Sequence, residues 1–406
     1  MLAALEADVL LDVLPSIDSP AIFVGADADA TPMAAITHAE LRNFVENELS
    51  ILDEYHVGPT DHVALLFPDG PQMIVALVAI MCRATVVPLS VASTDAELVA
   101  DLRAAGASVV IGAHGKMRGT LLTQQVAEEL NLLLFEAAPP TMCSGGGSSA
   151  TESASGLFSL TCLLDAREGL APTSASPSAR LGPRWLTGEG IAVLLQTSGT
   201  TGQKKLVPHS LQDVIAGALC IASSVPLVAE DVCLSQMPLH HVGGILRSVL
   251  APLLSGGSVA HLGGFSPVRF WKAACACGAT WYYASPSMHR LYLDELLAHP
   301  LPPEARFRLR YVANAAGGLP AALATEMREV YSRAVCSARS GFGEAPCDVT
   351  IAPSYGMTEC MPLAAPPANY SLEKPGSSGQ PIGPEMQIQD AVTGRKLPAG
   401  QVGAIA

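Results

Sequence analysis

The sequence predicts an α/β fold built from two α/β subdomains, in which mostly parallel sheets are flanked by helices. Short, continuous apolar segments alternate with segments of helical spacing, which is typical of parallel strands buried on both faces. The composition is that of a globular chain, because 49% of the 406 residues are hydrophobic and 15% are charged. Residues 141–183, rich in Gly, Ser, Thr, Ala and Pro, separate two series of elements and predict a loose connection.

The first series begins with a capping box, Thr37-x-x-Glu40, in front of a predicted helix. Apolar residues follow it at helical spacing: Leu41, Phe44, Val45, Leu49 and Leu52. A second capping box, Thr94-x-x-Glu97, predicts another helix, which ends near Gly106. The remaining predicted elements are strands over 63–67, 86–89 and 108–111 and a helix over 71–83.

The second series repeats this alternation after the low-complexity stretch. Residues Ile191 to Leu195 predict a buried strand, and Ser210-x-x-Asp213 predicts the cap of a helix from about Leu211. Further strands are predicted over 258–262, 280–284, 309–313 and 348–352, with helices over 286–298 and 320–331. Within the low-complexity stretch itself, residues 157–164 predict one short element.

Charge, apolar runs and cysteines limit the classes of protein. A net charge of −14 argues against a nucleic-acid partner, since a phosphate backbone needs a basic face. The apolar runs Met73 to Cys82 and Val214 to Ala229 are too short to span a bilayer and predict core helices. Ten scattered cysteines fit neither a zinc site nor a secreted disulfide framework, which favours a reducing, cytoplasmic compartment.

The loop after Leu195 has the composition of a phosphate-binding loop. It contains four hydroxyl residues and two glycines, followed by Lys204 and Lys205: Thr197, Ser198, Gly199, Thr200, Thr201 and Gly202. Small residues let the backbone approach an oxyanion, and hydroxyl and ammonium groups stabilise its charge. The spacing is not that of a Walker loop. The loop predicts that the protein handles a nucleoside triphosphate, and an ordinary polar surface turn is the alternative.

Together with this loop, three further segments make the chain resemble the adenylate-forming superfamily. The superfamily includes acyl-CoA synthetases, the adenylation domains of nonribosomal peptide synthetases and beetle luciferases. The segments are MPLHHVGG over 237–244, NAAGGLP over 314–320 and YGMTE over 355–359, and they occur in the family's order. The resemblance extends from about Ser19 to the last residue. One such motif is weak evidence, whereas four in order are strong evidence.

The resemblance implies a triphosphate site for ATP and Mg²⁺. Residues 197–202 would wrap the β- and γ-phosphates, and Lys205 would supply positive charge. The family usually has proline at the position of Lys204, and this extra lysine is still expected to favour phosphate. Thr358 would donate to the α-phosphate. Glu359 would hold Mg²⁺, a hard cation that prefers carboxylate and phosphate oxygens.

The resemblance also implies the adenine and acid sites. The adenine would lie against Tyr355 and Gly356, beside Ala316, Gly317 and Gly318, where small side chains leave room for the ring. His241, the second histidine of its motif, would lie near the reacting carboxylate. A histidine held by backbone groups in a turn is the alternative interpretation of this residue.

The chain is predicted to be one AMP-binding large domain over 15–406. It divides into a first α/β subdomain over 15–140, a low-complexity insertion or linker over 141–185, a second α/β subdomain over 186–370, and the start of a small β-barrel over 371–406. In the family, a C-terminal lid domain with a catalytic lysine follows. We expect the chain to be a fragment or a degenerate relative that binds nucleotide and acid with little complete turnover.

The implied reaction is the activation of a carboxylic acid. The acid attacks the α-phosphorus of ATP, acyl-AMP forms and pyrophosphate leaves, so that positioning and charge stabilisation dominate catalysis. Transfer to the thiol of coenzyme A, or of a carrier-protein phosphopantetheine, would follow in the full-length protein. Two alternatives remain: a non-catalytic nucleotide- or acyl-binding module, and a luciferase-like oxygenase that shares the motifs.

Overall fold

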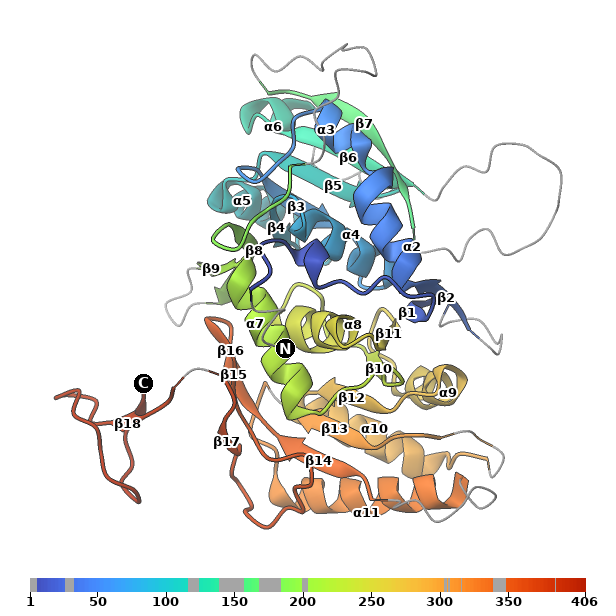
Figure 1. Ribbon diagram of the computed structural model, residues 1–406, viewed down its shortest axis with the longest axis vertical. Coiled ribbons are helices and arrows are strands. Elements are labelled where there is room, and N and C mark those ends of the chain that lie inside the picture. Colours follow the sequence, from blue (N-terminus) through green and yellow to red (C-terminus); the bar gives the residue numbers. More distant parts are fainter. Residues whose placement is uncertain are drawn as a thin grey trace.

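Two seven-stranded sheets, each flanked by helices, form the body of the protein (Figure 1). The computed structural model describes residues 6–25, 33–115, 124–138, 157–167, 184–198, 204–302, 305, 307–314, 316–338, 348–383 and 385–406. Both sheets are parallel in their interior and carry antiparallel strands at edges. The predicted α/β class is therefore confirmed.

The first sheet has the strand order β7-β6-β5-β3-β4-β8-β9. Its strands are β3 (His62–Leu66), β4 (Thr85–Pro88), β5 (Val109–Ala113), β6 (Leu133–Ala138), β7 (Ser159–Asp165), β8 (Ile191–Ser198) and β9 (Lys204–Ser210). The helical elements of this part are α2 (His38–Asn43), η2 (Phe44–Glu48), α3 (Ser50–Glu54), α4 (Pro71–Met81), α5 (Asp95–Ala105) and α6 (Gln124–Glu129). The short element predicted within the low-complexity stretch is the edge strand β7.

The second sheet has the order β14-β13-β12-β10-β11-β1-β2. Its strands are β1 (Pro20–Val24), β2 (Ala34–Thr37), β10 (Val232–Ser235), β11 (Ser258–His261), β12 (Trp281–Ala284), β13 (Tyr311–Asn314) and β14 (Thr350–Pro353). The remaining helical elements are η1 (Leu10–Asp12), α7 (Leu211–Ser224), η4 (Gly243–Leu250), α8 (Ala251–Leu254), α9 (Pro267–Cys277), α10 (Pro286–Ala298) and α11 (Ala321–Ala338).

Two small antiparallel sheets follow the second large sheet. One has the order β15-β16-β17, with β15 (Tyr355–Met357), β16 (Cys360–Ala365) and β17 (Gln380–Pro381). The other pairs β18 (Ile388–Gln389) with β19 (Ala404–Ile405). These last strands lie in the region 371–406, for which the sequence predicted the start of a β-barrel.

The predicted helix caps are present. The side chains of Thr37, Thr94 and Ser210 each accept a hydrogen bond from the backbone N–H of the residue three positions later. The acidic side chain of that later residue accepts a hydrogen bond from the backbone N–H of the capping residue. Gly106 ends α5 in the left-handed region at φ 60°, as a C-terminal glycine often does. The apolar residues predicted to share one helical face after Thr37 are all buried: Leu41, Phe44, Val45, Leu49 and Leu52.

The two sheets exchange chain segments, so the predicted subdomain boundaries do not coincide with the sheets. Strands β1 and β2 precede the first sheet in the chain but pair within the second, where β1 lies beside β11. Strands β8 and β9 follow the low-complexity stretch but complete the first sheet, where β8 lies beside β4. Sequence periodicity identifies a strand but not its partner, because pairing depends on distant residues.

The first apolar run predicted as a core helix is α4, and the second lies in α7 as far as Ser224, while its last five residues follow the helix. In α4, every residue from Met73 to Met81 is buried, and α7 buries one face against its neighbours. No helix among the described residues is long and apolar enough to cross a membrane. All cysteines that the structure describes are free thiols, including the Cys275-x-Cys277 pair on α9.

Candidate functional site

The motif segments follow the carboxyl ends of neighbouring strands. The turn with His240 and His241 follows β10, Asn314 to Gly318 follows β13, and Tyr355 to Glu359 follows β14. These strands are parallel and lie together in the order β14-β13-β12-β10. The carboxyl edge of a parallel sheet is where α/β proteins bind their ligands. The fold therefore gathers three of the four motifs along one edge.

The phosphate-loop motif joins the two strands of a hairpin. Strands β8 and β9 pair as far as Ser198 and Lys204, and the loop between them closes the hairpin. Gly199, Thr200, Thr201 and Gly202 lie outside the described residues, as does the side chain of Ser198. The sequence predicted β8 but not β9, which contains Pro208; a proline is tolerated here because β9 is an edge strand.

The two lysines after the loop point to opposite faces of β9, as neighbouring residues of a strand do. Lys204 Nζ lies 2.6 Å and 2.8 Å from the carboxylate oxygens of Asp101 on α5. The charge of Lys204 is thus paired with a carboxylate, and the expectation that Lys204 favours phosphate stays a prediction. Lys205 is exposed and lies on the face of β9 that also carries His209.

The YGMTE segment lies against this face of the hairpin. Tyr355 and Met357 belong to β15, which pairs with β16, so that Thr358 and Glu359 form the turn between the strands. Burial lowers the pKa of His209, and the backbone of Thr358 and the carboxylate of Glu359 oppose that shift from close by. The lysine-bearing strand and the acidic turn are thus adjacent.

Helix α7 fixes this arrangement because it continues from β9 and packs on β16. Gly217 on α7 makes a close backbone contact, since a Cβ there would lie 2.6 Å from the carbonyl oxygen of Met361. Asp213, in the first turn of α7, acts electrostatically on both His209 and Cys360. One helix therefore connects the β8–β9 hairpin with the strand that follows the YGMTE turn.

The NAAGG turn is tied to the start of YGMTE. The Ser354 hydroxyl donates to the Asn314 carbonyl oxygen at 2.7 Å, and the Asn314 amide donates to the Gly317 carbonyl oxygen at 2.9 Å. Ala316 adopts φ 59°, a left-handed conformation that is rare for residues other than glycine and common at functional sites. This brings the predicted adenine residues 316–318 to the base of Tyr355, whose ring is 36% exposed.

The histidine turn is held by a residue from the other sheet. Asp69, in the loop after β3, accepts a hydrogen bond from the Leu239 backbone N–H through Oδ1 at 2.9 Å. The rings of His240 and His241 lie 4.4 Å apart, and His241 keeps an exposed surface. Gly244 is needed next to them, because a Cβ there would lie 2.2 Å from the Pro238 carbonyl oxygen.

Both histidines of this turn are neutral near pH 7. Removal from water lowers the pKa of His240 and of His241, and the Asp69 carboxylate opposes the shift in each case. A neutral imidazole can accept or donate a hydrogen bond at a reacting carboxylate without forming a fixed ion pair. Asp69 therefore has two effects: it holds the turn through the Leu239 N–H, and its charge partly offsets the lowering of the pKa of both histidines.

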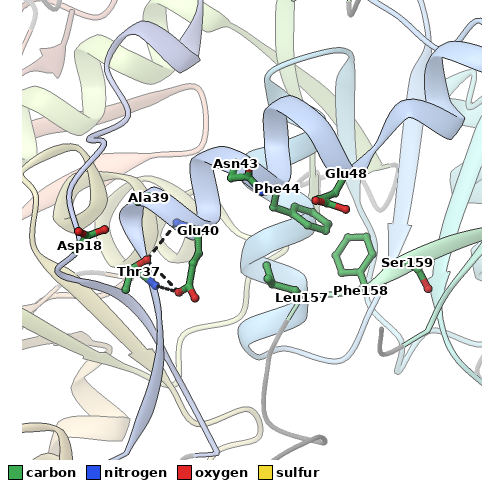
Figure 2. Close-up of a pocket in the computed structure, with 10 residues that line it drawn as sticks. All are labelled: Asp18, Thr37, Ala39, Glu40, Asn43, Phe44, Glu48, Leu157, Phe158 and Ser159. Carbon is green, nitrogen blue, oxygen red and sulfur yellow. Dashed lines mark hydrogen bonds between the residues drawn. The ribbon is translucent and has the colours of Figure 1, made fainter. Parts of the chain in front are cut away.

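A pocket of about 750 Å³ lies elsewhere, between α2, η2 and the start of β7 (Figure 2). Its floor is aromatic, with Phe44 and Phe158 at a centroid distance of 5.0 Å. Asp18, Glu40 and Glu48 give it an acidic lining, and Glu40 is engaged in the capping box with Thr37. An acidic pocket repels a triphosphate, so this pocket is not the nucleotide site.

Comparison with known proteins agrees with the motifs. A family model described as AMP-binding enzyme matches residues 18–406. The chain belongs to the AMP-binding enzyme superfamily. It is 30% identical over 370 residues to the probable CoA ligase CCL9 of Humulus lupulus, and 27% identical over 363 residues to the oxalate–CoA ligase of Arabidopsis thaliana. These alignments cover 89% and 87% of this chain and 62% of each relative, so this AMP-binding chain spans less than two thirds of their length.

A solved structure agrees with the fold of this AMP-binding chain. The ATP-bound MatB of Rhodopseudomonas palustris superimposes with a TM-score of 0.71 at 21% sequence identity. The superposition covers 98% of this chain and 70% of MatB. At this level of identity the likeness shows the fold.

The acidic turn of this AMP-binding chain is suited to a cation that bridges protein and phosphate. Among the described residues there is no group of three or more His, Cys, Asp or Glu side chains that could enclose a metal ion. Glu359 is exposed at its turn. A single carboxylate is what Mg²⁺ commonly takes from a protein when phosphate oxygens and water complete its shell.

Four residues in or near the candidate site have features that the sequence analysis did not identify. Asp69 and His209 gave no pattern signal, because their roles depend on contacts with distant segments. Asn314 was part of a recognised motif, but its buried Oδ1 has no hydrogen-bond partner among the described residues, which sequence does not show. Arg247 had a visible signal, a single charge within the apolar run from Ile245 to Leu250.

Proposed function

We propose that this chain binds ATP and a carboxylic acid for the adenylate-forming reaction, in which acyl-AMP and pyrophosphate are produced. The observation that carries the proposal is the contact of the β8–β9 hairpin with the Thr358–Glu359 turn through His209. It places the Thr358–Glu359 turn against His209, on the same face of β9 as Lys205, so that a lysine and a carboxylate lie on one side of the hairpin. These are the groups that position a triphosphate and stabilise the charge that develops on it.

The proposed role of each residue follows from its position. Residues 197–202 and Lys205 bind the β- and γ-phosphates, and Thr358 donates to the α-phosphate. The adenine stacks on Tyr355 next to Gly356, with residues 316–318 at its edge. His241 orients the attacking carboxylate. Mg²⁺, held by Glu359, would offset the negative charge of the phosphates.

The thiol acceptor proposed for the whole protein is coenzyme A. Both curated relatives described above are named as CoA ligases, which supports this choice over a carrier-protein phosphopantetheine. The acid is proposed to be small, because the Arabidopsis relative is named for oxalate. As the chain spans 62% of those relatives, thioester formation belongs to the proposal for the whole protein and not to these 406 residues alone.

The test compares two neighbouring lysines. We expect Lys205→Ala to weaken ATP binding, measured by calorimetry with Mg²⁺ present, by about tenfold or more, since it removes a charge-assisted phosphate contact. Lys204→Ala is the matched control and should change the affinity by less than about threefold, because Asp101 already pairs with Lys204. Equal effects of the two substitutions would contradict the proposed triphosphate site.

Chemistry is tested separately by ATP–pyrophosphate exchange across a panel of acids. In the whole protein, Lys205→Ala and Glu359→Ala should each abolish acid-dependent exchange. Exchange near the wild-type rate in either variant would remove that residue from the mechanism. Binding of ATP without exchange in the whole protein would instead identify a non-catalytic nucleotide-binding module.

A further inference from the structure

The helix that follows the histidine turn carries a charged residue into the protein core. Arg247 belongs to η4 and is 1% exposed. Its Nε and Nη2 atoms have no hydrogen-bond partner among the described residues. Its guanidinium lies over the ring of Tyr283, with Cζ 5.1 Å from the ring centroid. A buried guanidinium needs an anion, because an aromatic ring alone does not replace its lost hydration.

The surroundings of Arg247 supply no negative charge near neutral pH. The titratable groups that act on it are Tyr283, Tyr311 and Cys233, and burial raises the pKa of each one. All three are therefore neutral, and no carboxylate of the described part of the chain forms an ion pair with Arg247. Burial lowers the pKa of Arg247 itself, but a guanidinium remains protonated in proteins.

A second buried arginine, Arg83, has the partners expected of an arginine with a structural role. Arg83 is also 1% exposed, but its Nη1 lies 2.9 Å from Asp53 and its Nη2 donates to the Val45 carbonyl oxygen at 3.1 Å. The ring of Trp185 covers it at 4.9 Å. Arg83 thus has an aromatic neighbour and a carboxylate, whereas the described residues give Arg247 an aromatic neighbour and no carboxylate. The difference is the missing anion.

Arg247 lies next to the turn that carries the site histidines. A Cβ at Gly243 would lie 2.6 Å from the Tyr283 hydroxyl, so the same tyrosine touches the histidine turn at one end and Arg247 on its face. Trp281, on the same face of β12 as Tyr283, has a buried Nε1–H for which the described part of the chain provides no acceptor. Arginine and indole N–H groups can only donate, so a group that satisfies Nε and Nη2 of Arg247 and Nε1 of Trp281 must be an acceptor.

We propose that Arg247 binds a second anionic group of the substrate acid, while the reacting carboxylate lies at His241. The inference rests on the proposed function, because the acid must enter beside His241. A single tyrosine, Tyr283, connects the two positions, which fits an acid with a short chain between its two anionic groups. The substrate class is therefore a short dicarboxylic acid, and Arg247 determines that specificity.

The test measures binding of matched acids to the 406-residue chain by isothermal titration calorimetry. Oxalate, malonate and succinate are compared with acetate, propionate and butyrate, which have the same chain lengths and one carboxylate. We expect at least one diacid to bind about 30-fold or more tightly than the monoacid of the same chain length. This factor is at the lower end of the contribution that a buried pair of charges makes to binding. Arg247→Met should reduce this preference to within about threefold without changing monoacid affinity, and Arg247→Lys should retain part of it.

A second measurement separates binding from folding. Without ligand, Arg247→Met should unfold at the same urea concentration as the wild type or a higher one, because it replaces an unpaired buried charge by an apolar chain of similar length. A lower midpoint with an unchanged diacid preference would assign Arg247 a structural role and overturn the inference. Equal affinities for diacids and monoacids would also overturn it, while leaving the proposed function intact. Failure to bind ATP and every acid would overturn the proposed function as well.

Discussion

The hydrogen bond from the Leu239 backbone to Asp69 joins the loops of the two sheets at the candidate site, and replacing Asp69 tests its importance. A hydrogen bond to a charged group contributes about 1.5–3 kcal/mol when it is buried. Asp69 is partly exposed, so water replaces some of the lost interaction in a variant. We therefore expect Asp69→Ala to lower the free energy of unfolding by about 1–2 kcal/mol.

Asp69→Asn is the matched control, because its side-chain oxygen can still accept from Leu239 while the charge is removed. Asp69→Asn should lower the free energy of unfolding by less than about 1 kcal/mol. For both variants, the shift of the urea midpoint at an unchanged m-value gives the change in this free energy. The loss of charge should lower the pKa of His240 and His241 further, since Asp69 raises both. If Asp69→Asn destabilised the protein as much as Asp69→Ala, the carboxylate charge and not the hydrogen bond would be the stabilising term.

Two further predictions concern Gly244 and His289. Gly244→Ala should lower the free energy of unfolding by about 1–3 kcal/mol, because its Cβ would lie 2.2 Å from the Pro238 carbonyl oxygen, whereas Gly264→Ala meets no atom within 4 Å and should be neutral. Burial lowers the pKa of His289 to about 3, so the folded state binds fewer protons than the unfolded state below pH 6.5. As the pH falls from 6 to 4, the free energy of unfolding should therefore decrease more steeply in the wild type than in His289→Gln, by about 1.4 kcal/mol per pH unit. Urea unfolding at several pH values measures this, and an equal pH dependence in the two proteins would contradict the prediction.

Local patterns in the sequence predict many of the secondary elements of this fold, but not the strands β1, β2, β6 and β10. The three capping boxes specify helix starts because their hydrogen bonds involve residues only three positions apart. Strand β9 was missed because it contains two lysines and a proline, and an edge strand needs little apolar character. The sheet assignment of β1 and β8, and with them of their hairpin partners β2 and β9, also could not be predicted, since β1 pairs with β11 and β8 pairs with β4, which are distant in the sequence.

In the candidate site, too, local features could be predicted from the sequence and contacts between distant residues could not. The motif residues are recognisable because each motif is a short, continuous segment. The pairing of Lys204 with Asp101 is invisible in the sequence, because 103 positions separate the two residues. Arg247 differs, since a lone charge in an apolar helix is a visible anomaly. Only the structure shows that Arg247 lacks the carboxylate that Arg83 has.

The path of the chain explains why the site needs both sheets. Strands β1 and β2 tie the start of the chain to the second sheet, and β8 and β9 return the chain to the first (Figure 1). These crossings bring the carboxyl edge of β3, with Asp69, against the turn after β10. Without the first sheet, the Leu239 N–H would lack the acceptor that a backbone group in such a position requires. The position of His241 relative to the β8–β9 hairpin is therefore a property of the exchange of strands, and neither sheet alone determines it.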